Sequence, residues 1–185
     1  IELHPGVSTP APWVNVIANP RAGFIVSERG SSYTWTENSR ENRLTPWSND
    51  PVSDPSGEAL YLRDTASGEL WSPMPQPCGA GRFRVHHGQG YTTFVHAHDG
   101  IESQTTLTIA PDDPVKIIRL RLHNAGSITR ALSATMYVEW VLGVLREQTS
   151  LFIVTTIDAD LCALLARNTY SQDFAGRVAF LACSE

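Results

Sequence analysis

Apolar and polar residues alternate regularly through the middle of the chain, from Arg82 to Leu142. In residues 115–123, for example, isoleucine and leucine occupy one set of alternate positions, and arginine and histidine occupy most of the other. A period of two is typical of β-strands, and Gly, Asp, Asn and Pro between the segments favour turns and antiparallel pairing. The expected strands are residues 82–86, 91–98, 103–109, 115–123 and 131–142. Because each strand has one apolar face, they should form two sheets packed face to face, or a sheet against another layer.

The flanking segments predict further β-structure. Residues 23–35 read as a hairpin that turns near Gly30, and residues 59–73 as a second hairpin that turns at Ser67 and Gly68. Residues 1–20 are rich in proline and predict an extended N-terminal segment, and residues 50–58 predict a loop. Three more strands are expected over residues 151–157, 161–168 and 177–182. Residues 158–168 could instead form a short helix, but the β-branched residues just before them favour strands.

These elements predict an all-β protein, an antiparallel β-sandwich that forms one domain over residues 1–185. The length of 185 residues and the hydrophobic content of 42% suit a single domain with a sizeable core. No internal repeat or domain boundary is evident. The sequence starts without methionine, and its last residues alternate like a strand in progress. We therefore expect a fragment of a larger multidomain protein, with a sandwich that is incomplete at its C-terminus.

Charge and cysteine content limit the classes of partner and compartment. The chain has 14 basic and 19 acidic residues, a net charge of -5, and no long basic run. A nucleic-acid partner is not expected, because phosphate binding needs clustered Lys and Arg. No apolar run is long enough to span a bilayer and no signal peptide is recognised, so direct membrane insertion is not expected. The three cysteines form neither a CxxC pair nor an even set, which indicates reduced thiols in the cytoplasm.

Few residues in the expected strands suggest chemistry. His96 and His98 lie two apart on one strand, and with His86 they could ligate a metal, but half-exposed sheet histidines are the favoured interpretation. Glu139 and Tyr137 share a polar strand face that could line a sugar-binding cleft or simply face solvent. No nucleophile elbow, phosphate-binding loop or HExxH helix is present. We therefore assign no catalytic residue, no metal ligand and no cofactor.

Residues 34–50, TWTENSRENRLTPWSND, combine two tryptophans with arginine, asparagine and acidic side chains. Indole rings stack on the apolar face of a pyranose, and bidentate side chains satisfy its hydroxyl groups. The segment therefore suits carbohydrate binding. The alternative is an ordinary loop that satisfies its own polar groups, with Trp35 and Trp47 at the edge of the core.

Several long strings in the chain resemble one protein family, and the resemblance covers nearly the whole sequence. They include TPAPWVNVIANPRAGFIVSE, YTWTENSRENRLTPWSNDPVSDPSGEALYLRD, HGQGYTTF, DDPVKIIRLRLHN, YVEWVLG and ALLARNTYSQDFAGRVAF. The chain is similar to cyclic β-1,2-glucan synthases and to the inverting phosphorylases of cellobiose and chitobiose, in glycoside hydrolase family 94, formerly glycosyltransferase family 36. These sequence strings are most similar to those of the glucan-synthase branch.

The resemblance implies a supersandwich of the galactose-mutarotase type, followed by a helical linker and an (α/α)6 barrel that carries the catalytic acid. The parent protein would be a glycosyltransferase or glycoside phosphorylase, and this domain would have no activity of its own. It would complete a site for β-glucan or gluco-oligosaccharide in the downstream barrel. The residues expected to contact carbohydrate are Trp35, Arg40, Asn42, Arg43, Trp47, Asn49 and Asp50.

The sequence is also compatible with three other functions. The domain could bind glucan by itself through Trp35 and Trp47. It could act as an aldose epimerase, as mutarotases share this architecture, with His86, His96 and Glu139 as candidates. It could also form the contact of a homodimer. The resemblance further implies a cytoplasmic domain whose parent protein is anchored in the inner membrane through other domains.

Overall fold

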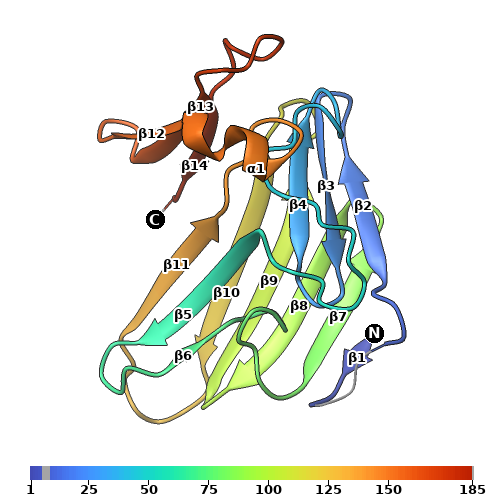
Figure 1. Cartoon of the computed structure of the whole chain (residues 1–185). Coiled ribbons are helices and arrows are strands. Elements are labelled where there is room, and N and C mark those ends of the chain that lie inside the picture. Colours follow the sequence, from blue (N-terminus) through green and yellow to red (C-terminus); the bar gives the residue numbers. More distant parts are fainter. Residues whose placement is uncertain (6–8, 185) are drawn as a thin grey trace.

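The computed structural model describes residues 1–5 and 9–184, and antiparallel β-strands make up most of it (Figure 1). One layer is a five-stranded sheet in the order β1 (Glu2–Leu3), β7 (Phe83–Gly88), β8 (Tyr91–His98), β9 (Ile101–Ile109) and β10 (Lys116–Asn124). Two three-stranded sheets face it. They consist of β2 (Val14–Ala18), β3 (Ala22–Ser27) and β4 (Ser32–Thr36), and of β11 (Leu132–Val138), β5 (Glu58–Asp64) and β6 (Leu70–Trp71). The all-β sandwich expected from the alternation is confirmed.

The main core lies between these layers and is built from the inward positions of their strands. It contains Leu3, Ile17, Phe24, Val26, Leu60, Met74, Phe83, Val85, Phe94 and Leu107. Neighbouring strands align these positions, since Val85 lies opposite Phe94 and Thr92 lies opposite Leu107. Full burial of a side chain of this kind contributes about 1.5–3 kcal/mol. The period-two pattern therefore stabilises the fold by placing one face of each strand in this core.

Both predicted hairpins are present. β3 and β4 pair across a turn in which Gly30 has a φ of 93°, a conformation that glycine adopts without steric cost. β5 and β6 pair across the turn at residues 65–69, where the Asp64 carboxylate accepts hydrogen bonds from the backbone N–H groups of Ala66 and Ser67. The extended segment expected over residues 1–20 includes the short strands β1 and β2.

The C-terminal part of the chain forms a separate three-stranded sheet of β12 (Ile153–Asp158), β13 (Ala163–Asn168) and β14 (Ala179–Ala182). All three expected strands are confirmed, and the alternative helix over residues 158–168 is wrong. The Asp158 carboxylate accepts hydrogen bonds from the N–H groups of Asp160 and Leu161, so it caps a tight turn between β12 and β13. A four-residue helix, α1 (Arg146–Thr149), and the 3-10 turn η1 (Ser150–Phe152) precede this sheet and were not expected.

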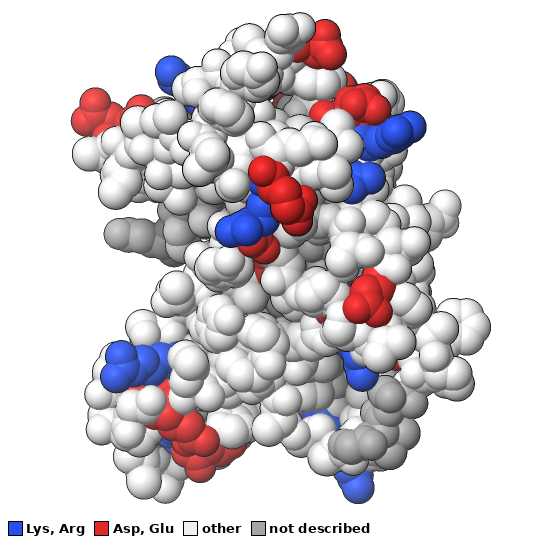
Figure 2. Space-filling view, viewed as in Figure 1, with Lys and Arg blue, Asp and Glu red and all other residues white. Residues whose placement is uncertain are grey.

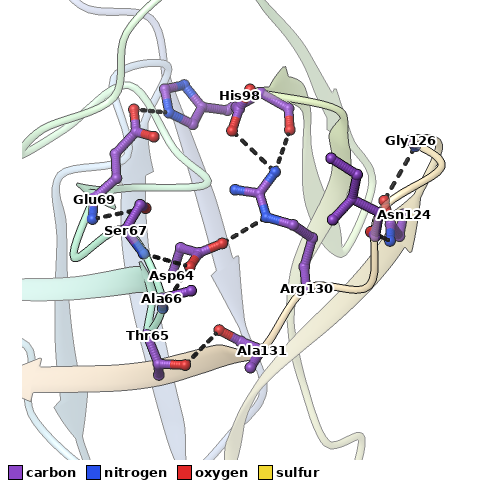
Figure 3. A network of polar contacts seen from close by, with 12 residues as sticks. Asp64, Thr65, Ala66, Ser67, Glu69, His98, Asn124, Gly126, Arg130 and Ala131 are labelled. Atoms are coloured by element: carbon purple, nitrogen blue, oxygen red, sulfur yellow. Dashed lines mark hydrogen bonds and ion pairs between the residues drawn. The ribbon is translucent and has the colours of Figure 1, made fainter.

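Arg130 joins three loops at one end of the sandwich, those after β5, between β8 and β9, and before β11 (Figure 3). Its Nε donates to Asp64 at 2.5 Å, and its Nη1 lies 2.9 Å from both the carbonyl and the carboxylate of Asp99. Asp64 ends β5, Asp99 lies between β8 and β9, and Arg130 precedes β11. The hydrogen bond from Arg130, followed by those from the Ser67 and Ala66 backbones, lowers the pKa of Asp64. The network therefore links both layers.

Replacing Arg130 with alanine is expected to lower the thermal unfolding midpoint at pH 7, because Asp64 and Asp99 lose their shared partner. A carboxylate with a depressed folded pKa stabilises the protein above its unfolded pKa, and this contribution disappears as pH falls through the folded pKa. The difference between wild type and R130A should therefore shrink in acid. R21A, which removes an exposed pair 3.8 Å apart, is the control. Equal midpoints for the two variants would contradict this role.

Candidate functional site

The tryptophan-rich segment folds back against β4 and a distant part of the chain. Arg43 bridges Trp35 on one side and Gly143 on the other in short antiparallel pairings. The carbonyl of Val144 accepts a hydrogen bond from Arg43 at 3.4 Å. The segment therefore lies where the sandwich meets the connection to the β12–β14 sheet.

Three of the predicted carbohydrate-binding residues gather around Tyr33. The Tyr33 ring centroid lies 5.2 Å from that of Trp35 and 5.0 Å from that of Trp47, and the Arg43 guanidinium lies 5.9 Å from it. We call Tyr33, Trp35, Arg43 and Trp47 the aromatic cluster. Tyr33 itself is buried, which raises the pKa of its hydroxyl, whereas both indoles are half-buried. Tyr33 was not among the residues predicted from the sequence, although its position two residues before Trp35 on one strand was the available signal.

The other four predicted residues do not join the aromatic cluster. Asn42 is buried, and its side chain donates to the Thr36 carbonyl at 3.2 Å, so it closes the loop after β4. Arg40 is exposed and pairs with its neighbour Glu41 at 3.5 Å. Asn49 and Asp50 are also exposed, and the Asp50 carboxylate accepts from the Val52 N–H at 2.9 Å within a turn. In these turns the polar side chains bond to groups within the loop, as in the ordinary loop that was the alternative interpretation of the sequence.

A cleft of about 1840 Å³ opens beside this segment, between the sandwich and the β12–β14 sheet. Trp35 and Asn42 belong to its wall. Most of its lining is apolar and includes Ile118, Leu120, Met136, Trp140, Leu164 and Phe180. β10 and β11 are the outermost strands of their respective sheets, and both contribute to the lining. Among the described residues, nothing covers this apolar surface.

The same wall contains a buried ion pair between Lys116 of β10 and Glu58 of β5. The Glu58 carboxylate also accepts hydrogen bonds from Thr34 and Thr45 at 2.6 and 2.7 Å. Lys116 donates to Ser32 at 2.7 Å. Burial alone would raise the pKa of Glu58, but the attraction of Lys116 and these hydrogen bonds outweigh it and hold the pKa below its usual value. The chain's one lysine is therefore fully engaged in joining the two layers.

The three candidate histidines do not converge on one point, although the His96 and His98 ring centroids lie 6.1 Å apart. His96 points inward, stacks on Phe83 with ring centroids 3.9 Å apart, and has its pKa lowered by burial. His98 points the same way as His96, as expected, and pairs with Glu69 at 2.8 Å (Figure 3). His86 is exposed on the opposite face of the sheet. No three His, Cys, Asp or Glu residues within residues 1–5 and 9–184 lie close enough together to hold a metal ion.

The epimerase candidates are also separated. His86 and His96 occupy opposite faces of the five-stranded sheet, and Glu139 forms an ion pair with Arg146 beyond the end of β11. A single sugar could not contact all three in this arrangement.

The surface and the helices add two observations. On the face seen in Figure 2, acidic and basic side chains lie in small separate groups rather than in one charged field. Within the described part of the chain, neither α1 nor any other helix has the length and apolar character needed to cross a membrane. The described helices are α1, of four residues, and the 3-10 turn η1, of three.

Comparison with known proteins matches the chain from residue 1 to residue 185 to the model of the glycosyl hydrolase 94 supersandwich domain. The chain is 40% identical over 184 residues to the cyclic beta-(1,2)-glucan synthase NdvB of Rhizobium meliloti. This alignment covers 98% of the chain and 6% of that relative. It is 27% identical over 135 residues to the N,N'-diacetylchitobiose phosphorylase of Vibrio proteolyticus, or 71% of the chain. It is 28% identical over 149 residues to the solabiose phosphorylase of Paenibacillus borealis, or 74% of the chain.

The chain spans only a small part of these relatives, 6%, 17% and 18% of their respective lengths. The match to the supersandwich model nevertheless extends over the whole sequence. The all-β architecture is consistent with this match, and the chain belongs to glycoside hydrolase family 94 as a supersandwich domain.

Proposed function

We propose that this domain is a non-catalytic part of a larger carbohydrate-active enzyme, in which it scaffolds and completes a sugar site carried by an (α/α)6 barrel. One observation carries the proposal: Trp35, one of the two half-buried indoles of the aromatic cluster, lines an apolar cleft that the described residues leave open. An apolar surface of this extent favours contact with another structural unit. The aromatic cluster would then lie at the margin of that contact.

The chemistry of the aromatic cluster suits a glucan or gluco-oligosaccharide. Trp35 and Trp47 offer indole surface for stacking, and the Arg43 guanidinium offers planar donors. The relatives support this class, because their names give a glucan synthase and two disaccharide phosphorylases. In this proposal the catalytic acid and the phosphate site belong to the barrel, and the domain supplies part of the wall around the sugar.

The 185-residue chain should therefore neither release nor consume phosphate when it is supplied with sophorose, β-1,2-glucan or glucose 1-phosphate. In a longer protein that contains the domain and a barrel, W47A should raise KM for the glucan more than it lowers kcat, because it removes binding surface rather than a reacting group. W13A removes an exposed indole outside the aromatic cluster and is the matched control. Turnover by the 185-residue chain itself would refute a non-catalytic role.

The aromatic cluster also supports a second candidate, an independent glucan-binding module. Titration of the 185-residue chain with β-1,2-gluco-oligosaccharides separates the two. Millimolar binding, about -4 kcal/mol, that W47A abolishes would favour the independent module. No binding by the chain alone, together with a KM effect in the longer protein, would favour the scaffold.

A further inference from the structure

The outward face of the five-stranded sheet carries a group of arginines, of which only Arg119 also belongs to the lining of the cleft. The strand register places Arg84 of β7 in one row with Val95, Gln104 and Arg121 of β8, β9 and β10. The next row runs from His86 through Thr93 and Thr106 to Arg119. Arg84 and His86 form a column along β7, which Arg82 continues just before the strand. Arg119 and Arg121 form a second column along β10, which His123 continues. We call this surface the arginine face, with residues Arg82, Arg84, His86, Arg119, Arg121 and His123.

The guanidinium groups of the arginine face are largely free to bind a partner. Arg82, Arg119 and Arg121 form no ion pair and no side-chain hydrogen bond with any residue that the structure describes, and all three are exposed. Arg84 has only a weak pairing with Glu2, at 3.7 Å. By contrast, Arg130, Arg146 and Arg177 each pair with a carboxylate at 2.9 Å or less. Among the described residues, five arginines form neither an ion pair nor a side-chain hydrogen bond, and three of them lie on this sheet face; Arg63 and Arg167 are the other two.

Between the two arginine columns, the two central rows carry uncharged side chains, and the next row carries Ala97 and the exposed carboxylate of Glu102, which lies opposite His123. Thr93 and Thr106 join their hydroxyl groups at 3.0 Å, and with Val95 and Gln104 they form the strip between the columns. Arg84 and Arg121 are three strand spacings apart, about 14 Å, and Arg119 and Arg121 are about 7 Å apart along β10. An α-helix with its side chains is about 10–12 Å wide, so one helix fits between the columns.

We propose that the arginine face binds an acidic α-helix of a partner polypeptide, with small residues against the strip and carboxylates along both flanks. Carboxylates at i and i+4 on a helix match the spacing of Arg119 and Arg121, and guanidinium forks bind carboxylates in pairs. Local charge favours this partner, because the four arginines of this face outnumber the two carboxylates beside them, those of Glu2 and Glu102. The two central rows have no aromatic ring between the arginines, but Tyr91 continues the same face of β8, so a single-stranded oligonucleotide is the competing occupant in the test.

Fluorescence anisotropy of a labelled synthetic helix tests the proposal. The probe carries glutamates at i and i+4 on both flanks of an alanine strip, and a sequence with lysine at those positions is its negative control. The wild-type chain should bind the acidic helix, more weakly at higher salt. R119E/R121E should weaken binding by about tenfold or more. R63E/R167E removes two other exposed arginines and makes the same charge change, and it should alter binding by less than about twofold.

Three results would overturn the proposal. They are no binding of the acidic helix by the wild type, an equal loss in the two double variants, and tighter binding of a single-stranded oligonucleotide that R119E/R121E abolishes. Circular dichroism of each variant establishes that it is folded before it is titrated. None of these measurements involves sugar or phosphate, so the outcome is independent of the carbohydrate role proposed above.

Discussion

Replacing Lys116 with methionine is expected to lower the free energy of unfolding by about 3–5 kcal/mol, because it leaves the buried Glu58 carboxylate without its cation. Methionine keeps most of the side-chain volume over the Phe24 ring, where the ammonium now lies 4.5 Å from the centroid. The loss is therefore electrostatic rather than a loss of packing. Urea unfolding at pH 7, followed by circular dichroism, measures it.

The double variant K116M/E58L is the matched control. Removing both charges together should recover most of the stability, because apolar side chains of similar size often replace a buried ion pair at little cost. The two single changes should thus be strongly non-additive. If the double variant were as unstable as the sum of the singles, packing and not charge would explain the effect.

The pH dependence of this pair has a definite sign. Burial raises the pKa of Glu58, but Lys116 and the hydrogen bonds lower it by more, so the folded pKa lies below the unfolded value. The contribution to stability is therefore present above the unfolded pKa, and is lost as pH falls through the folded pKa. E58Q should remove this part of the acid sensitivity. In K116M the carboxylate keeps its burial but loses the cation, so its pKa should rise and the variant should gain relative stability as pH falls.

The strands and their inward faces could be predicted because a period of two is a local property of the sequence. Val85, Phe94 and Leu107 each occupy an alternating apolar position, and all three are buried in the main core. The turn near Gly30 could be predicted for the same reason, since the conformational freedom of glycine is a property of one residue. The short helix α1 has no comparable signal in its four residues.

The candidate site could be predicted only in part, because it depends on pairings between distant segments. Arg43 reaches the aromatic cluster while its backbone pairs with Gly143, a hundred positions later in the chain. Arg40, Asn49 and Asp50 have the same residue types but lie in turns that expose them. Composition therefore singled out the segment as a candidate site, which stays a prediction, but could not determine which of its side chains would meet.

The buried ion pair and the arginine face illustrate the same limit. Lys116 was notable in the sequence only as the one lysine, and its partner Glu58 belongs to a strand of the opposite layer. The alternation put Arg119 and Arg121 on the outward side of β10. Their alignment with Arg84 follows from the sheet order β7–β8–β9–β10, which no local pattern specifies.

Gly23 is the residue on which the aromatic cluster depends most directly. It lies opposite Trp35 on one neighbouring strand and Ala18 on the other. A Cβ atom at this position would lie 2.3 Å from Cζ2 of the indole and 2.8 Å from the Ala18 Cβ. The Trp35 ring therefore rests on bare backbone, and only glycine leaves room for it.

Replacing Gly23 with alanine is expected to lower the free energy of unfolding by about 1–3 kcal/mol, the usual cost of overpacking. This exceeds the gain of about 0.4–1 kcal/mol that alanine brings by restricting the unfolded chain. Displacement of Trp35 should also change the near-ultraviolet circular dichroism of the aromatic cluster. G176A, where an added Cβ would meet nothing within 4 Å, is the control and should be neutral or slightly stabilising.

A second substitution separates crowding against the indole from a general intolerance of alanine in β3. In the W35L background the ring that the new Cβ would strike is absent, so G23A should cost less there than in the wild type. If the cost were the same in both backgrounds, the contact with Ala18 would dominate instead. If binding of gluco-oligosaccharide depends on the position of Trp35, G23A should weaken it while leaving the Arg43–Tyr33 contact in place, because Gly23 faces Trp35 and not Arg43.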